Sequence, residues 1–100
     1  MPLTRDYQES LIESLSDPLE AAEYLNAALE EGDRELFLLC LKNVVQAQGG
    51  MSKLAKESTL NRESLYKMLS KKGNPKVSSL DSLLHAMNMR LVVQPIETAL

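Results

Sequence analysis

Tryptophan is absent from this chain of 100 residues, which holds only one phenylalanine and three tyrosines. The core must therefore be aliphatic, built from Leu, Val and Met. Glycine and proline occur four times each, and the long stretches of Leu, Ala, Glu and Lys favour a mainly α-helical fold. The length suits a single domain over residues 1–100, with one modest core that leaves little room for a deep catalytic pocket.

Cysteine and histidine are represented by one residue each, Cys40 and His85. A single cysteine forms no internal disulfide and is typical of a reducing compartment. Cys40 lies in an apolar stretch, where a small core residue is expected. No catalytic triad, carboxylate pair or metal-ligand set can be named around one histidine. We therefore predict no enzymatic activity, no metal site and no cofactor.

Long hydrophobic runs are also lacking. A membrane-spanning helix needs roughly 20 apolar residues, and residues 1–10 are polar, without the apolar core of a signal peptide. We expect a cytoplasmic protein that makes no membrane contact.

Positive charge is scarce at one end of the chain and concentrated at the other. Residues 1–40 hold two Arg and ten Asp or Glu, a net charge of −8, whereas residues 41–100 hold nine Lys or Arg and four acids, a net charge of +5. Binding to nucleic acid requires a local positive face rather than a positive total. The acidic part suits a basic protein partner, or serves only as a solvated surface.

Two helices are predicted in the acidic part, after a weakly structured segment 1–16. The first occupies residues 17–32, where Asp17 can cap the helix, Pro18 suits its first position and Gly32 stops it. Its inward side is expected to comprise Leu19, Ala22, Leu25 and Leu29, with Tyr24 and Ala28 at the edge. The second begins after Asp33 and ends at Gly49-Gly50; its apolar surface is wide enough for burial on several sides.

Residues 51–70 read as a bihelical unit, two short helices joined by a tight turn. Its apolar positions are Leu54, Ala55, Leu60, Leu65, Met68 and Leu69, and Asn61 can cap the second helix. The opposite face of that helix is polar, which is typical of a helix that reads the major groove. A generic αα-hairpin has the same spacing. The basic loop 71–76 favours the DNA-binding interpretation.

A last helix and a short strand are predicted beyond the loop. Ser78 and Asp81 fit a capping box, Leu80, Leu83, Leu84 and Met87 form a buried stripe, and Asn88 can end the helix in the left-handed conformation. Residues 90–94 are read as a strand closed by Pro95. Its partner would be the same strand of a second copy, joined through Leu91, Val92 and Val93. The alternative is an extended tail packed on its own core.

Four segments together carry a family resemblance: residues 22–33 (AEYLNAALEEGD), 49–55 (GGMSKLA), 61–70 (NRESLYKMLS) and 73–75 (GNP). The chain resembles, over residues 7–95, the addiction module antidote proteins, HigA-like antitoxins of bacterial type II toxin–antitoxin systems. The resemblance implies a lambda-repressor-like (XRE, Cro/cI) helix-turn-helix domain of about five helices, here with an extra N-terminal acidic helix and a short C-terminal β-strand.

The resemblance also implies partners. The protein would bind its own operator as a transcriptional repressor, associate with the nucleoid when bound, neutralise a RelE/ParE-type toxin and form a homodimer. The toxin would meet the acidic helix 18–31 or the tail after Pro95. Thr59 stands where the general repressor pattern has Gly, and Ser58 replaces an apolar or small residue, so the geometry of the turn is open.

Particular side chains are expected to contact a palindromic double-stranded operator. Base reading falls to Arg62, Glu63 and Lys67; Arg62 can take a guanine bidentately, worth about 1–3 kcal/mol of discrimination. Glu63 can accept from a cytosine or pair with Lys67 at i,i+4. Phosphate contacts are expected from Ser52, Lys53, Ser64, Tyr66, Lys71, Lys72, Asn74 and Lys76. The rival function is a helical protein-interaction module that uses the same fold without DNA.

Overall fold

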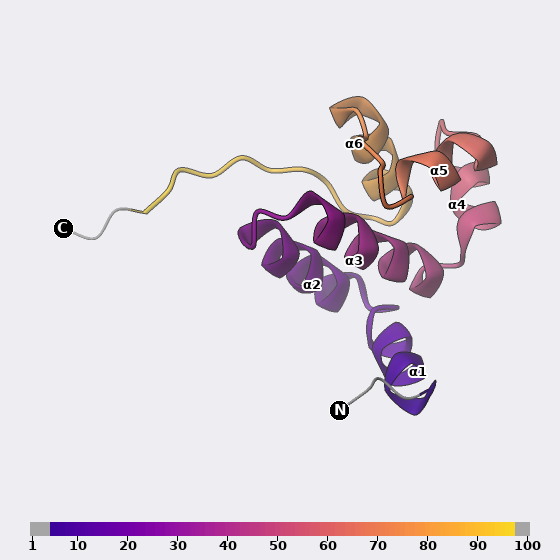
Figure 1. Cartoon of the computed structure of the whole chain (residues 1–100), viewed down its shortest axis with the longest axis horizontal. Helices are drawn as coiled ribbons and strands as arrows, with labels where there is room; N and C mark the ends of the chain where they lie inside the picture. Colours follow the sequence, from indigo (N-terminus) through magenta and orange to yellow (C-terminus); the bar gives the residue numbers. More distant parts are fainter. Residues whose placement is uncertain (1–4, 98–100) are drawn as a thin grey trace.

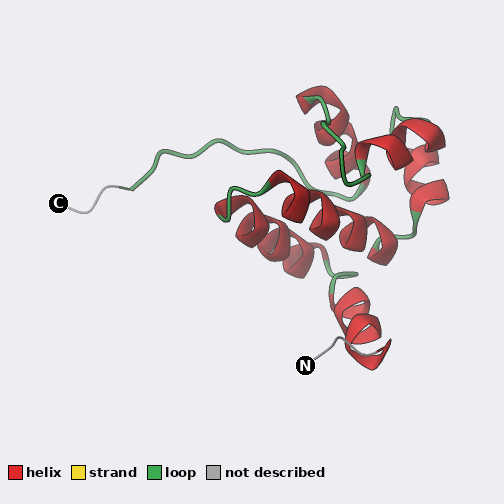
Figure 2. Ribbon diagram, viewed as in Figure 1, coloured by secondary structure: helices red, strands yellow, loops and turns green. Residues whose placement is uncertain are grey.

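The computed structural model describes residues 5–97, which form six helices and, within that range, no strand (Figures 1 and 2). The helices are α1 (Arg5–Ser14), α2 (Pro18–Glu30), α3 (Arg34–Ala47), α4 (Met51–Glu57), α5 (Arg62–Met68) and α6 (Val77–Ala86). The mainly α-helical class is as predicted. No helix among these residues is long and apolar enough to cross a membrane.

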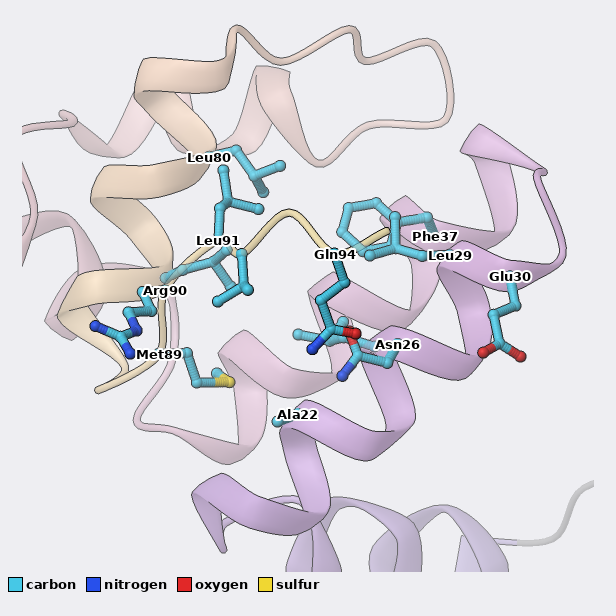
Figure 3. A pocket seen from close by; sticks show the side chains of 13 residues that line it. Ala22, Asn26, Leu29, Glu30, Phe37, Leu80, Met89, Arg90, Leu91 and Gln94 are labelled. Carbon is cyan, nitrogen blue, oxygen red and sulfur yellow. The ribbon is translucent and has the colours of Figure 1, made fainter. Parts of the chain in front are cut away.

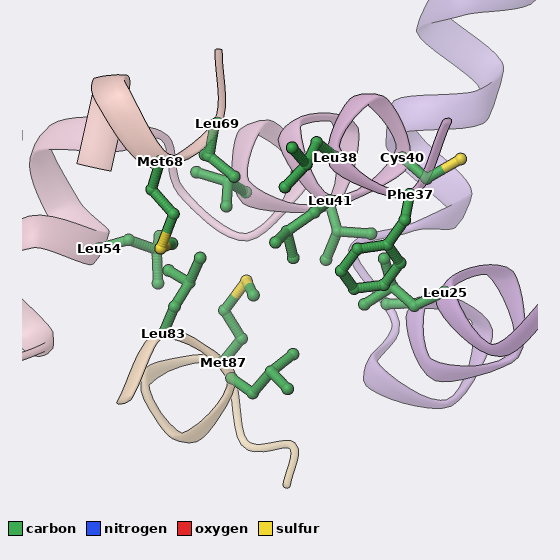
Figure 4. Packing of buried hydrophobic residues seen from close by; sticks show 14 of the residues in the cluster. Leu25, Phe37, Leu38, Cys40, Leu41, Leu54, Met68, Leu69, Leu83 and Met87 are labelled. Carbon is green, nitrogen blue, oxygen red and sulfur yellow. The ribbon is translucent and has the colours of Figure 1, made fainter. Parts of the chain in front are cut away.

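Helix α3 is the centre of the arrangement. It packs against α1, α2 and α4, and α4 in turn packs against α5 and α6 (Figure 1). Leu41 and Val44 of α3 are fully buried, and Leu83 of α6 and Met87 just after it point toward Leu41 (Figure 4). Burial of α3 on several sides is confirmed, although Leu39 remains 57% exposed.

The start of the chain corrects the sequence interpretation, because residues 5–14 of the segment expected to be weakly structured form α1; residues 1–4 lie outside the described range. Tertiary contacts hold α1 in place. Leu15 is buried, and the side-chain amide of Gln48, the residue just after α3, donates to the carbonyls of Leu15 and Ser16 at 2.9 and 3.0 Å. These contacts satisfy acceptors just after the helix end, and a distant glutamine is not visible in local periodicity.

Helix α2 begins and ends as predicted, but its buried face is rotated. The Asp17 carboxylate accepts from the Leu19 N–H at 3.0 Å, and Gly32 has φ +71°. Leu19 and Leu29, expected inside, are 68% and 51% exposed. The buried residues are Ala21, Leu25 and Ala28. Two of these three residues are alanines, so the buried face of α2 consists mainly of small side chains.

The bihelical unit matches its predicted bounds: α4 and α5 flank a turn at residues 58–61, and Leu54 and Leu65 are fully buried. In α6, Leu83, Leu84 and Met87 are buried and Asn88 has φ 62°, both as expected. The prediction of a capping box at the start of α6 is wrong. The helix begins at Val77 after Lys76, without a side-chain cap, so Ser78 lies inside the first turn.

The prediction of a C-terminal strand over residues 90–94 is also wrong. Residues 90–97 are extended without regular secondary structure and leave the helical body, in yellow in Figure 1. A strand needs a neighbouring strand for its backbone hydrogen bonds, and the described part of the chain supplies none. We call residues 90–97 the C-terminal arm.

Candidate nucleic-acid interface

The N-terminus of α5 is fixed by Asn61. Its side-chain oxygen accepts from the Ser64 N–H at 2.7 Å, which satisfies one of the free donors of the first turn. Glu63 lies in that first turn, where the positive end of the helix dipole stabilises its negative charge. With Leu65 and Met68 buried on the other side of the helix, this cap sets which side chains face solvent. Arg62 therefore occupies the first exposed position of the helix.

Arg62 is held by the aromatic ring one turn further along α5. Its guanidinium carbon lies 5.5 Å from the centroid of the Tyr66 ring, and its Nη2 donates to the Tyr66 hydroxyl at 3.3 Å. A cation–π contact at an exposed site is worth about 0.5–1 kcal/mol. Tyr66, predicted to bind phosphate, thus has a partner within the helix. It restricts the orientations of Arg62.

Glu63 and Lys67 are both exposed on α5, as base reading requires. Among residues 5–97 the structure shows no ion pair between them, so the intrahelical pairing considered from their spacing does not form here. Their charged groups are both unpaired.

The turn between α4 and α5 accommodates Thr59 without the left-handed conformation. Asn88 is the only non-glycine residue with positive φ in the described range. Instead, the Ser82 hydroxyl of α6 accepts from the Thr59 N–H at 3.0 Å and lies 2.8 Å from the Thr59 hydroxyl. Ser58 accepts from the Leu60 N–H at 3.2 Å. Sequence reasoning missed Ser82, because its partner lies 23 residues away.

The backbone path of the basic loop after α5 depends on Gly73. Its N–H donates to the Ser70 carbonyl at 2.8 Å, and a β-carbon at this buried position would collide with the carbonyl oxygen of Met68. Only glycine fits so close to the end of α5.

The four residues of this loop that are predicted to bind phosphate are exposed, but one of them already has an ion-pair partner. Lys72, Asn74 and Lys76 are exposed. Lys71 is also exposed, and its Nζ lies 3.5 Å from a carboxylate oxygen of Glu35 in α3. An exposed pair of this kind contributes little to stability, but it partly neutralises one of the predicted phosphate contacts.

All eleven residues predicted to contact DNA are solvent-exposed: Ser52, Lys53, Arg62, Glu63, Ser64, Tyr66, Lys67, Lys71, Lys72, Asn74 and Lys76. The structure brings Arg62 and Tyr66 together and places Lys71 beside Glu35. The three residues predicted for dimerisation, Leu91, Val92 and Val93, are exposed on the C-terminal arm.

Two titratable side chains outside this interface, Tyr24 and His85, have polar partners. Burial raises the pKa of Tyr24, whose hydroxyl accepts from the Asn43 side chain at 3.0 Å between α2 and α3. His85 lies 3.2 Å from the Asp81 carboxylate, a pair that sequence reasoning overlooked. Within residues 5–97 no three His, Cys, Asp or Glu side chains are grouped to hold a metal ion.

Comparisons with known proteins define the class. A family model described as "Probable addiction module antidote protein" matches residues 7–95. An uncharacterized protein of Haemophilus influenzae (strain Rd) is 37% identical over 82 residues, which cover 82% of this chain and 84% of that protein. The comparison with solved structures finds no significant match.

The chain therefore belongs to the addiction module antidote family. Membership suggests an antitoxin without enzymatic activity, and implies interaction with a cognate toxin.

Proposed function

We propose that this antitoxin is also a sequence-specific DNA-binding repressor of its own operon, with a HigA-like, lambda-repressor-like helix-turn-helix formed by α4 and α5. One observation carries the proposal. Helix α5 buries Leu65 and Met68 and exposes Arg62, Glu63 and Lys67, and an exposed basic loop follows it. A short helix with a polar outer face and adjoining lysines has the chemistry of a major-groove reader.

Recognition divides between two groups of side chains. Arg62 and Lys67 donate to acceptors on base edges, with Arg62 oriented by Tyr66, and Glu63 accepts from a cytosine. The lysines of the loop neutralise phosphates and set the register without reading sequence. Because α5 has only seven residues, one copy reads only a few base pairs. Two copies with recognition helices about 34 Å apart read a palindrome.

A homodimer joined through Leu91, Val92 and Val93 supplies the second copy. These side chains are apolar and exposed on an arm that leaves the helical body (Figure 1). Exposed apolar segments of this kind are expected at association surfaces. Dimerisation by the arm does not require a preformed strand.

The DNA proposal is tested with a duplex taken from immediately upstream of the protein's own coding sequence. Arg62→Ala should weaken binding at least about tenfold, the loss expected for one bidentate contact, while far-ultraviolet circular dichroism stays unchanged. Arg34→Ala is the matched control: it removes an exposed arginine from α3 and should leave affinity nearly unchanged.

Salt dependence separates this proposal from the rival interaction module. Binding to DNA should weaken steeply with added salt, with a log–log slope of about −0.9 per phosphate contact. Equal affinities of wild type, Arg62→Ala and Arg34→Ala for the duplex would reject the assignment of α5 as the reader.

The cognate toxin is proposed to be a basic RelE/ParE-type protein that meets the acidic face of α2 or the tail after Pro95. Glu20, Glu23 and Glu30 are all exposed on α2, and opposite charges steer association. The double substitution of Glu20 and Glu23 to Gln should reduce co-purification of the toxin and leave DNA binding intact. Unchanged co-purification would leave this face as a solvated surface.

A further inference from the structure

Helix α2 exposes two leucines, Leu19 and Leu29, that the described part of the chain leaves largely uncovered. Ala21, Leu25 and Ala28 face the core, whereas Leu29 is 51% exposed. Among the helices of residues 5–97, only α3 packs closely on α2. An apolar side chain on the free side of a helix gains stability only when another surface covers it.

A groove runs along this free side of α2. Figure 3 shows its walls: Ala22, Asn26 and Leu29 from α2, Phe37 from α3, Leu80 from α6, and Leu91 and Gln94 from the arm. Its volume is about 690 Å³, enough for several side chains. Nine of its thirteen lining residues are apolar, and the other four are Asn26, Glu30, Arg90 and Gln94; the groove opens to solvent.

The C-terminal arm exposes apolar side chains that could cover the apolar residues of the groove. Val92, Val93 and Ile96 are 63%, 97% and 89% exposed. The only charge between residues 89 and 96 is Arg90, and Arg90 and Glu30 are the only charged residues among those that line the groove. The eight residues of the arm span about 26 Å when extended, and the 13 residues of α2 form a helix about 20 Å long. The arm is therefore long enough to lie along the whole of α2, and its exposed side chains are apolar like most of the residues that line the groove.

The end of the arm does not fill the groove of its own chain. Residues 89–92 and 94 already line one wall, so Ile96 would reach the floor only if the chain reversed after residue 94. The chain makes no such reversal, because residues 91–97 contain no turn. The arm instead continues away from the helical body (Figure 1).

We infer that the groove along α2 receives the arm of a second copy, in a two-fold exchange in which each arm lies on the other chain's α2. Because groove and arm belong to the same chain, one isologous contact covers both apolar surfaces in both copies and closes the assembly. This inference rests on the homodimer proposed above, but not on DNA or toxin binding.

Two leucine substitutions test it on the full-length protein without DNA or toxin. Leu29→Glu places a charge in the groove, and Leu39→Glu places the same charge on α3, where Leu39 is 57% exposed and lines no part of the groove. Light scattering across a dilution series should show a dimer for wild type and Leu39→Glu. It should show at least tenfold weaker self-association for Leu29→Glu, with unchanged helical circular dichroism.

Cross-linking identifies the contact itself. In a Cys40→Ala background, chains carrying only Leu29→Cys are mixed with chains carrying only Val93→Cys and treated with a short bismaleimide. Each chain then has one thiol, so any product joins two chains. The mixture should cross-link far more than a mixture of Lys42→Cys with Val93→Cys chains.

Three results would overturn the inference: a monomeric wild type, equal self-association of Leu29→Glu and Leu39→Glu, or no excess of the Leu29–Val93 product. A dimer that persists in Leu29→Glu while toxin co-purification is lost would assign the groove to the toxin. None of these results depends on whether Arg62→Ala affects DNA binding, so failure of the exchange and failure of the DNA proposal remain distinguishable.

Discussion

Helices α1, α2 and α3 have 10, 13 and 14 residues, whereas α4 and α5 have seven each. The longer helices carry the acidic surface and join through the broad apolar contact of α3. The shorter pair is fixed at its ends: Asn61 caps α5, Ser82 binds the turn, and Gly73 lets the loop close against Met68.

This difference shows how short helices can present a functional surface. A helix of seven residues is not stable in isolation, so its buried leucines and terminal hydrogen bonds must define it. Since those contacts lie on the inner side and at the ends, Arg62, Glu63 and Lys67 are not needed for folding and are available to a ligand. The same division predicts which substitutions affect stability and which affect binding.

The largest effect is expected from Leu65→Ala. Leu65 is fully buried, and truncation of such a leucine costs about 2–5 kcal/mol of unfolding free energy. Urea denaturation measures the loss. Leu19→Ala in α2 is the control, since a largely exposed side chain should change stability by no more than about 0.5 kcal/mol. Similar values for the two variants would contradict the dependence of α5 on its core contact.

Gly73→Ala should follow, with a loss of about 1–3 kcal/mol from overpacking. The new methyl group meets the Met68 carbonyl, so the loop must move and carry its lysines with it. DNA affinity should therefore fall together with stability. Asn74→Ala at the next, exposed position is the comparison, and its unfolding free energy should be close to that of wild type. A stable Gly73→Ala protein would show that the loop can relax.

Asn61→Ala should cost about 1 kcal/mol through loss of the cap. Hydrogen–deuterium exchange should accelerate at the amides of α5 and remain unchanged in α2. Asn61→Asp offers the same acceptor and should restore protection. Equal exchange in the Ala and Asp variants would mean that the bond to the Ser64 N–H does not stabilise α5.

The smallest effect is expected from Glu35→Gln, which releases Lys71 from its exposed ion pair. Stability should change by less than about 0.5 kcal/mol. DNA affinity should rise about twofold, because Lys71 becomes fully available to a phosphate. Gel-shift titration is the measurement, and Glu31→Gln, which removes an unpaired exposed acid, controls for the change in net charge. Equal gains in both variants would attribute the effect to net charge alone.

Local patterns determined much of this fold. Caps at Asp17, Asp33 and Asn61, the stops at Gly32 and Asn88, and the burial of Leu54, Leu65 and Leu83 all agree with the sequence analysis. Each depends on residues within one or two helical turns, where spacing and backbone preference suffice. The exposure of the residues proposed to contact DNA follows from the same periodicity.

Tertiary structure alone decided the remainder. Helix α1 depends on Gln48, more than 30 residues away, and the turn at Thr59 depends on Ser82. The buried face of α2 is set by its packing against α3, which is a property of the pair of helices rather than of α2 alone. The arm stays extended because strand pairing needs a neighbour that no local sequence supplies. Contacts between distant segments carry no periodic signal, so folding determined them and sequence spacing could not.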